Sequence, residues 1–419
     1  MSEYRRTRRR VVFTREGWSF IAILAFVVVG SILRQINLLV MLAAMMIPAL
    51  LFNWRMSVSL MRRISVRHSL PEWLFAGRAS VIELEVQNDS RTFAAWNIVL
   101  TDFIKRVVPT AGEPRTKSVD TIAVSVEPGH KTHVSYRCLF AERGIYRVGP
   151  VKVACKYPFG LVLVWFHQLD SAELYVAPRL GELKPKWDKR LGALAVGTAS
   201  AERRRGWLPD EFFGLRKWQH GDSLRSIHWR SSAKRGQLTV KQFDQPTDRD
   251  FALALDMFTP TVDSGKPIEL MELAASFVAT ALARLNYSIH GRVAIAICGE
   301  RSCLFTNQVP GEFVGSVMKE LANVQPTPLD VIFENLRELS AKVSPGTPLI
   351  VVTTRDSSEI QALRKSKDLE ANENLWESSL RWVQVESDEF REMFSLPMLL
   401  DYSGLPIDNS LIVAPVVED

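Results

Sequence analysis

Two apolar segments near the N-terminus constrain this chain more than any other feature. Residues 18–33 and 38–54 contain no charged side chain, and only Arg34, Gln35, Ile36 and Asn37 separate them. Each segment is close to the lower limit of roughly 17–25 residues for a helix that crosses a bilayer. Neither has the polar face of a helix packed in a globular core, and no signal-peptide cleavage pattern separates them. Residues 1–63 are therefore predicted to form a transmembrane anchor of two helices that contacts the lipid bilayer.

Positive charge flanks both apolar segments and is scarce between them. The arginines before the first segment are Arg5, Arg6, Arg8, Arg9, Arg10 and Arg15, those after the second are Arg55, Arg62, Arg63 and Arg67, and the turn has Arg34 alone. Because positive residues near spans stay in the cytoplasm, both flanks are expected there. The sequence thus predicts a multi-pass protein of the cytoplasmic (inner) membrane, with both termini and the soluble domains in the cytoplasm.

The formal charge of +6 does not indicate a nucleic-acid partner. Residues 1–67 hold 11 of the 52 Lys and Arg residues and two of the 46 Asp and Glu residues, a net charge of +9, so the remaining chain carries −3. The excess positive charge therefore marks membrane topology, with the arginines beside anionic head groups. No nucleic-acid binding is expected.

Residues 64–178 have the pattern of short antiparallel strands. Residues 81–87 and 121–126 alternate apolar and polar side chains and stop at turn-forming residues, and residues 133–140 and 146–155 are further candidate strands. Several short strands at this spacing favour an antiparallel β-sandwich of immunoglobulin-like type.

From residue 250 to 419 the pattern changes to alternating strands and helices. Continuous apolar runs at 251–255, 293–297 and 349–353 are typical of strands buried on both faces, and 382–385 and 411–414 are further candidates. Helical spacing of apolar residues recurs between them, at 270–285, 313–324, 331–343 and 359–371. This order predicts a Rossmann-like, doubly wound α/β domain.

Residues 179–249 form a connector with the most distinctive local sequence. Asp222 is placed to cap a helix with Leu224 and Ile227 on its apolar side and Gly236 at its end. Arg216 and Arg225 could pair with Glu211 or Asp222. The favoured interpretation is a buried structural latch; the alternative is an anion or partner site made of Arg216, Arg225, Arg230 and Lys234.

This stretch resembles the defining motif of the bacterial "domain of unknown function 58" family. The matching or substituting residues that are also the candidate partner-binding residues are Arg216, Trp218, Gly221, Asp222, Arg225, Ile227, Trp229, Ala233 and Lys234, and Ser232 matches the motif as well. A second family-like stretch runs from residue 143 to 150 and continues at 157–161. The resemblance implies a membrane-tethered protein with a C-terminal von Willebrand factor A-like domain and a MoxR-type AAA+ ATPase as partner.

The resemblance also allows a test for a metal site. Metal-binding A domains carry Asp-x-Ser-x-Ser after the first strand, which supplies oxygen ligands to a hard cation. Here Asp256 is present, but Phe258 and Pro260 replace both serines, and Arg355 introduces a positive charge after the third central strand. The four cysteines show no ligand spacing and are expected to be free thiols. No metal or cofactor is predicted.

Two functions follow from these observations. The first is a non-enzymatic adaptor or scaffold that works with a MoxR-type AAA+ ATPase in envelope-associated assembly. The alternative is a hydrolase or transferase with an unrecognised site near Asp222, His220 and His228. The adaptor is favoured because the chain lacks the common hydrolase, nucleotide-binding and metalloprotease motifs.

Overall fold

The computed structural model comprises two compact units, described one at a time. The first unit contains residues 1–179 and 398–419, and the second contains residues 180–397. The described residues are 6–34, 36–107, 116–184, 205–206, 211–219, 222–244, 250–260, 265–285, 292–306, 310–344, 347–364, 380–399 and 412–415.

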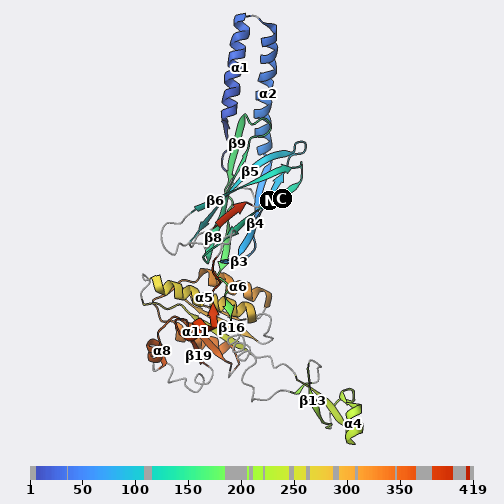
Figure 1. The fold of residues 1–419 in the computed structure, drawn as a ribbon, viewed down its shortest axis with the longest axis vertical. Helices are drawn as coiled ribbons and strands as arrows, with labels where there is room; N and C mark the ends of the chain where they lie inside the picture. The colour runs from blue at the N-terminus through green and yellow to red at the C-terminus, as the bar shows by residue number, and fades with distance from the viewer. Residues whose placement is uncertain are drawn as a thin grey trace. The chain divides into compact units, whose positions relative to one another are not determined.

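Two apolar helices, α1 (Arg15–Arg34) and α2 (Asn37–Met61), lie side by side in the first unit (Figure 1). Both are long and apolar enough to cross a membrane, and most of their surface is exposed. This confirms the predicted pair of apolar helices. The end of α2 also contributes to the core of the same unit, because Leu60 and Met61 are buried there.

Two sheets share that core. The seven-stranded sheet contains β1 (Arg10–Phe13), β3 (Trp73–Phe75), β5 (Ala95–Arg106), β6 (Thr116–Val126), β8 (Gly144–Cys155), β9 (Val162–Gln168) and β10 (Ala172–Ala177). The four-stranded sheet contains β2 (Ile64–Ser69), β4 (Ala79–Asn88), β7 (Lys131–Leu139) and β21 (Ile412–Pro415). Alternate residues such as Ile82 and Leu84 from one sheet and Val151 and Val153 from the other are buried together. All pairings are antiparallel except that of β3 with β10.

The C-terminal strand corrects the predicted boundaries. Residues 411–414 were assigned to the α/β domain of residues 250–419, but β21 pairs antiparallel with β7 of the first unit, where Figure 1 shows it in red. A short apolar run carries no information about which sheet it joins, because pairing partners are set by tertiary contacts. The basic N-terminal flank also contributes a strand, since β1 pairs antiparallel with β9.

The second unit contains a five-stranded sheet in the order β17-β16-β15-β18-β19. Its strands are β15 (Phe251–Asp256), β16 (Val293–Cys298), β17 (Cys303–Thr306), β18 (Leu349–Thr353) and β19 (Leu380–Gln384). Only β17, at the edge, is antiparallel. Every residue of β15, β16 and β18 is buried, as expected of parallel strands covered on both faces.

Helices alternate with these strands. They are α5 (Gly265–Leu285), α6 (Pro310–Asn323), α7 (Ile332–Lys342), α8 (Ser357–Arg364) and α11 (Asp388–Met393). Two short strands, β11 (Glu182–Leu183) and β20 (Phe394–Ser395), also pair in this unit. The predicted helices at 313–324 and 331–343 correspond to α6 and α7. The helix predicted at 359–371 is α8, and its last residues lie outside the described part of the chain.

The motif-bearing connector is a small three-stranded sheet with a helical insertion. Its strands are β12 (Arg205–Gly206), β13 (Glu211–Lys217) and β14 (Thr239–Asp244), in the order β12-β14-β13. Between β13 and β14 lie a 3-10 turn, η1 (Leu224–Ser226), and a short helix, α4 (Trp229–Arg235).

Candidate functional site

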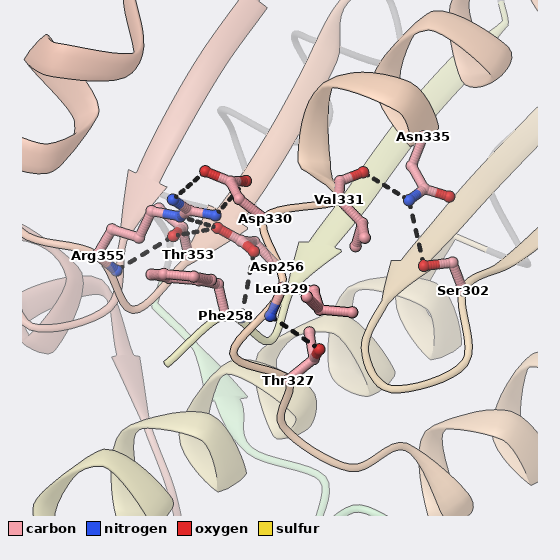
Figure 2. A network of polar contacts seen from close by, with 10 residues as sticks. All are labelled: Asp256, Phe258, Ser302, Thr327, Leu329, Asp330, Val331, Asn335, Thr353 and Arg355. Carbon is pink, nitrogen blue, oxygen red and sulfur yellow. Dashed lines mark hydrogen bonds and ion pairs between the residues drawn. The ribbon is translucent and has the colours of Figure 1, made fainter. Parts of the chain in front are cut away.

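The first candidate site lies where the parallel strands of the second unit end. Strands β15 and β18 are neighbours, and their last residues, Asp256 and Thr353, lie opposite one another in the register. In open α/β sheets the carboxyl ends of the strands are the usual place for a ligand. Here Asp256 Oδ2 accepts a hydrogen bond from Thr353 Oγ1 at 2.9 Å and one from Arg355 Nε at 2.7 Å (Figure 2).

Arg355 links this carboxylate to a second one. Its Nη1 and Nη2 donate to the two oxygens of Asp330, just before α7, at 2.9 and 2.7 Å. The guanidinium also lies over the Phe258 ring, 4.0 Å from the centroid. The side chains of Arg355 and Asp256 are only 4% and 2% exposed, whereas that of Asp330 is 38% exposed.

The surroundings of Arg355 favour its charged form. Burial alone would lower the pKa of Arg355, but hydrogen bonds to Asp330 and Asp256 leave that pKa above the ordinary arginine value. The other oxygen of Asp256, Oδ1, accepts the backbone N–H of Phe258 at 3.2 Å. The protein's own cation thus binds both carboxylates at the strand ends.

This geometry bears on the expected absence of a metal. In the described part of the chain, no group of three or more His, Cys, Asp or Glu residues is arranged to hold a metal ion. The cation facing Asp256 is Arg355, the residue that the sequence singled out there. Asp330 was missed, because it precedes α7 in a loop and no local pattern connects it with residue 256.

The second candidate site is the family-like motif. Arg216, near the end of β13, binds Asp222 through two hydrogen bonds of 2.6 Å, and Asp222 also accepts the Gln219 N–H at 2.8 Å. The Arg216 guanidinium and this N–H hold the pKa of Asp222 below its usual range, and Asp222 in turn raises the pKa of Arg216. This pairing is one of those that the sequence suggested.

The helix caps differ in part from the prediction. Ser223, not Asp222, caps η1 by accepting the Arg225 N–H, and His228 caps α4 by accepting the Ser231 N–H. The Asp222 carboxylate instead accepts two hydrogen bonds from Arg216. Gly236 ends α4 with a φ of 63°, as predicted for a glycine cap.

Burial within the motif is uneven. Ile227 is 5% exposed and forms a β-bridge with Val240 of β14, and Ser232 is also buried. In contrast, Leu224 and Trp229 are 68% and 65% exposed. The basic residues Arg225, Arg230 and Lys234 are exposed too, as is Ala233, whereas Trp218 is intermediate. A buried latch therefore describes Ile227 but not Leu224 or Trp229, since a short helix on a three-stranded sheet covers only one side of the insertion.

The residues of the alternative enzyme site can be placed only in part. His220 and Gly221 lie outside the described residues. His228 Nδ1 is 2.8 Å from Ser231 Oγ, within the α4 cap, and the Asp222 carboxylate is held by Arg216. For the described members, the hydrogen bonds are those of a local structural motif.

Comparison with known proteins gives one family match, over about a third of the chain. Residues 214–353 match the family model described as "Protein of unknown function DUF58", which spans most of the motif together with β15 and β18. The match supports assignment of the chain to the DUF58 family, as the motif residues indicated. None of the curated proteins matches the chain.

Similar solved structures show only weak likeness. A beta-glucosidase from Listeria innocua is 17% identical with a TM-score of 0.20, and the aligned region covers 27% of this chain and 16% of that chain. The alkylpurine DNA glycosylase AlkC from Pseudomonas fluorescens, bound to DNA containing an abasic site analog, is 17% identical with a TM-score of 0.20, covering 27% and 30%. The C-terminal domain of wzt is 14% identical with a TM-score of 0.21, covering 28% and 72%. Such scores carry no functional argument.

Proposed function

We propose that this chain is a membrane-anchored, non-enzymatic adaptor that presents its second unit to a protein partner at the cytoplasmic face. The observation that carries the proposal is the Arg355 cluster. At the strand ends, where an α/β sheet usually binds its ligand, a buried arginine binds Asp256 and Asp330. Because Arg355 already binds the carboxylates to which a ligand would bind, this site suits a fixed scaffold better than a reaction on a small molecule.

The arrangement of the first unit supports a single-sided topology. Strand β1 precedes α1 and pairs with β9, while α2 continues into β2. Both ends of the hairpin thus enter the same pair of sheets, which supports a topology with the N-terminal strand and the sheets on one side of the membrane. The arginine-rich flanks favour the cytoplasm for that side. In this proposal the protein is a multi-pass protein of the inner membrane.

The finer classification is part of the same proposal. The parallel order β16-β15-β18-β19 with covering helices is consistent with a von Willebrand factor A-like domain, and the two sheets over one core with an immunoglobulin-like sandwich. The resemblance in the motif suggests a MoxR-type AAA+ ATPase as the partner. The exposed side chains of Leu224, Trp229 and Arg225 offer a surface for it.

Affinity purification from solubilised membranes tests the adaptor. The wild-type chain is expected to recover an AAA+ ATPase, and Trp229→Ala or Arg225→Ala to recover several-fold less while remaining folded, because both side chains are exposed. Lys241→Ala, an exposed change on neighbouring β14, is the matched control and should recover the wild-type amount. Equal recovery by all four chains, or no ATPase with the wild type, contradicts the proposal.

The alternative is a hydrolase or transferase near Asp222, His220 and His228. Its support is the closeness of these residues in sequence and the hydrogen bond between His228 and Ser231. Turnover of a small substrate by the purified chain, lost in His228→Ala and retained in Lys241→Ala, would establish an enzyme and displace the adaptor.

A further inference from the structure

The loop of residues 156–161, between β8 and β9, holds the start of helix α1. Thr14 Oγ1 donates to the Gly160 carbonyl at 2.6 Å, and the Thr14 N–H donates to the Leu161 carbonyl at 3.1 Å. Gly17, in the first turn of α1, is buried against Leu161, and a Cβ at this glycine would overlap the Leu161 carbonyl oxygen. Helix α1 therefore leaves the sheet at a fixed point.

The same loop also holds α2. The Phe159 N–H donates to Asn53 Oδ1 at 3.2 Å, and Ser57 Oγ donates to the Tyr157 carbonyl at 2.5 Å. Asn53 and Ser57 are 0% and 1% exposed, although both belong to an otherwise apolar helix. One loop of six residues thus contacts both helices, α1 at its start and α2 near its end.

The apolar surface of the hairpin begins beside this loop. Exposed apolar side chains cover both helices from Trp18 to Trp54, and Trp18, Phe52 and Trp54 are 62%, 52% and 49% exposed. The loop places Phe159 there, 57% exposed, with its ring centroid 6.4 Å from that of Phe52. Aromatic side chains at such a boundary favour the interface between hydrocarbon and head groups.

Three cationic side chains lie near this boundary, together with the carboxylate of Glu16, which interacts with Lys156 and Arg15. All three are exposed: Arg15 is at the start of α1, Arg55 follows Trp54 in α2, and Lys156 is at the start of the loop. Arg9, before α1, donates through Nε to the carbonyl of Met61, the last residue of α2. Long cationic side chains beside exposed aromatic rings are complementary to acidic phospholipid head groups.

From this geometry we infer that the loop of residues 156–161 is a membrane-interface element. Phe159 sits among the head groups, and Arg15, Arg55 and Lys156 bind acidic phospholipid head groups around it. The two sheets are thereby held against the membrane surface as an extension of the hairpin. The inference rests on the proposed anchor and adds a lipid-contacting surface on the soluble part of the first unit.

The test uses the full-length chain in lipid nanodiscs with an environment-sensitive fluorophore on single introduced cysteines. Cys138, Cys155 and Cys298 are buried, so replacement of the partly exposed Cys303 by serine gives a chain in which the native thiols are not expected to react with the fluorophore. Labels are placed at Phe159→Cys, at Phe26→Cys in α1 and at Ser118→Cys on β6. Phe26 is 81% exposed and reports the anchor itself.

Ser118 is the matched control far from the membrane. It lies opposite Phe103 on β5, whereas Ile98, five residues earlier, lies opposite Cys155 beside the loop. At ~3.3 Å per residue the two positions are about 17 Å apart along the strand. Its label is expected to stay in water.

The Phe159 label is expected to show blue-shifted emission and several-fold stronger quenching by bromines near the lipid head groups than the Ser118 label. Adding phosphatidylglycerol to phosphatidylcholine nanodiscs should strengthen that quenching, and the Arg15→Gln, Arg55→Gln, Lys156→Gln variant should lose the increase. A Phe159 label as aqueous as the Ser118 label, with the Phe26 label in lipid, overturns the inference but leaves the anchor. An aqueous Phe26 label overturns the anchor. No dependence on phosphatidylglycerol overturns the binding of acidic head groups.

Discussion

Replacing Arg355 with alanine is expected to lower the free energy of unfolding of the second unit by about 3–5 kcal/mol, the cost of removing one partner from a buried ion pair. Asp256, only 2% exposed, would be left buried without the guanidinium that now binds it. Hydrogen exchange of the full-length chain measures the effect, as a loss of protection in peptides from β15 and β18, the two strands that end at this cluster.

Two further variants make the Arg355 prediction specific. Arg381→Ala removes an exposed arginine from β19 and is expected to change stability by no more than about 0.5 kcal/mol. Asp330→Asn should cost less than Arg355→Ala, because Asp330 is 38% exposed and water can replace part of its ion pair. Unchanged protection in Arg355→Ala would refute the structural role of the cluster.

Replacing Gly17 with alanine is expected to weaken the junction between the hairpin and the sheets by about 1–3 kcal/mol, the usual cost of overpacking. The added methyl group would overlap the backbone carbonyl of Leu161, which cannot rotate away as a flexible side chain could. Hydrogen exchange of the loop of residues 156–161 and of the first turns of α1 should increase.

Gly30→Ala is the matched control in the same helix. Its Cβ would meet only Leu39 Cδ1, at 3.6 Å, which is an ordinary packing distance. Because alanine has the higher helix propensity by about 1 kcal/mol, this change should be neutral or stabilising. The same effect for both glycines would mean that the loop does not hold α1 as described.

Periodic patterns made much of the fold predictable. The uncharged segments indicated α1 and α2, and continuous apolar runs indicated β15, β16 and β18, because burial on both faces leaves a local signature. The pairing of Arg216 with Asp222 was also accessible, since the two residues are close in sequence. Gly236 was assigned as a helix end for the same reason.

Long-range pairings were not accessible. Strand β21 joins β7, more than 270 residues earlier in the chain, and the arginine-rich flank forms β1 only because β9 offers an edge. Asp330 and Arg355 are 25 residues apart in sequence and meet only through the tertiary fold. In the sequence, the loop of residues 156–161 shows only a family-like pattern, because its contacts with Asn53 and Ser57 connect residues about 100 apart.

The sidedness of the soluble units is the central claim, and cysteine accessibility in intact cells tests it directly. In the Cys303→Ser background, Ile36→Cys places a thiol in the exposed turn between α1 and α2, and Ser118→Cys places one on β6. A membrane-impermeant maleimide should label residue 36 in spheroplasts and residue 118 only after lysis. Labelling of residue 118 in intact spheroplasts, with residue 36 protected, would contradict an adaptor that acts on the cytoplasmic side.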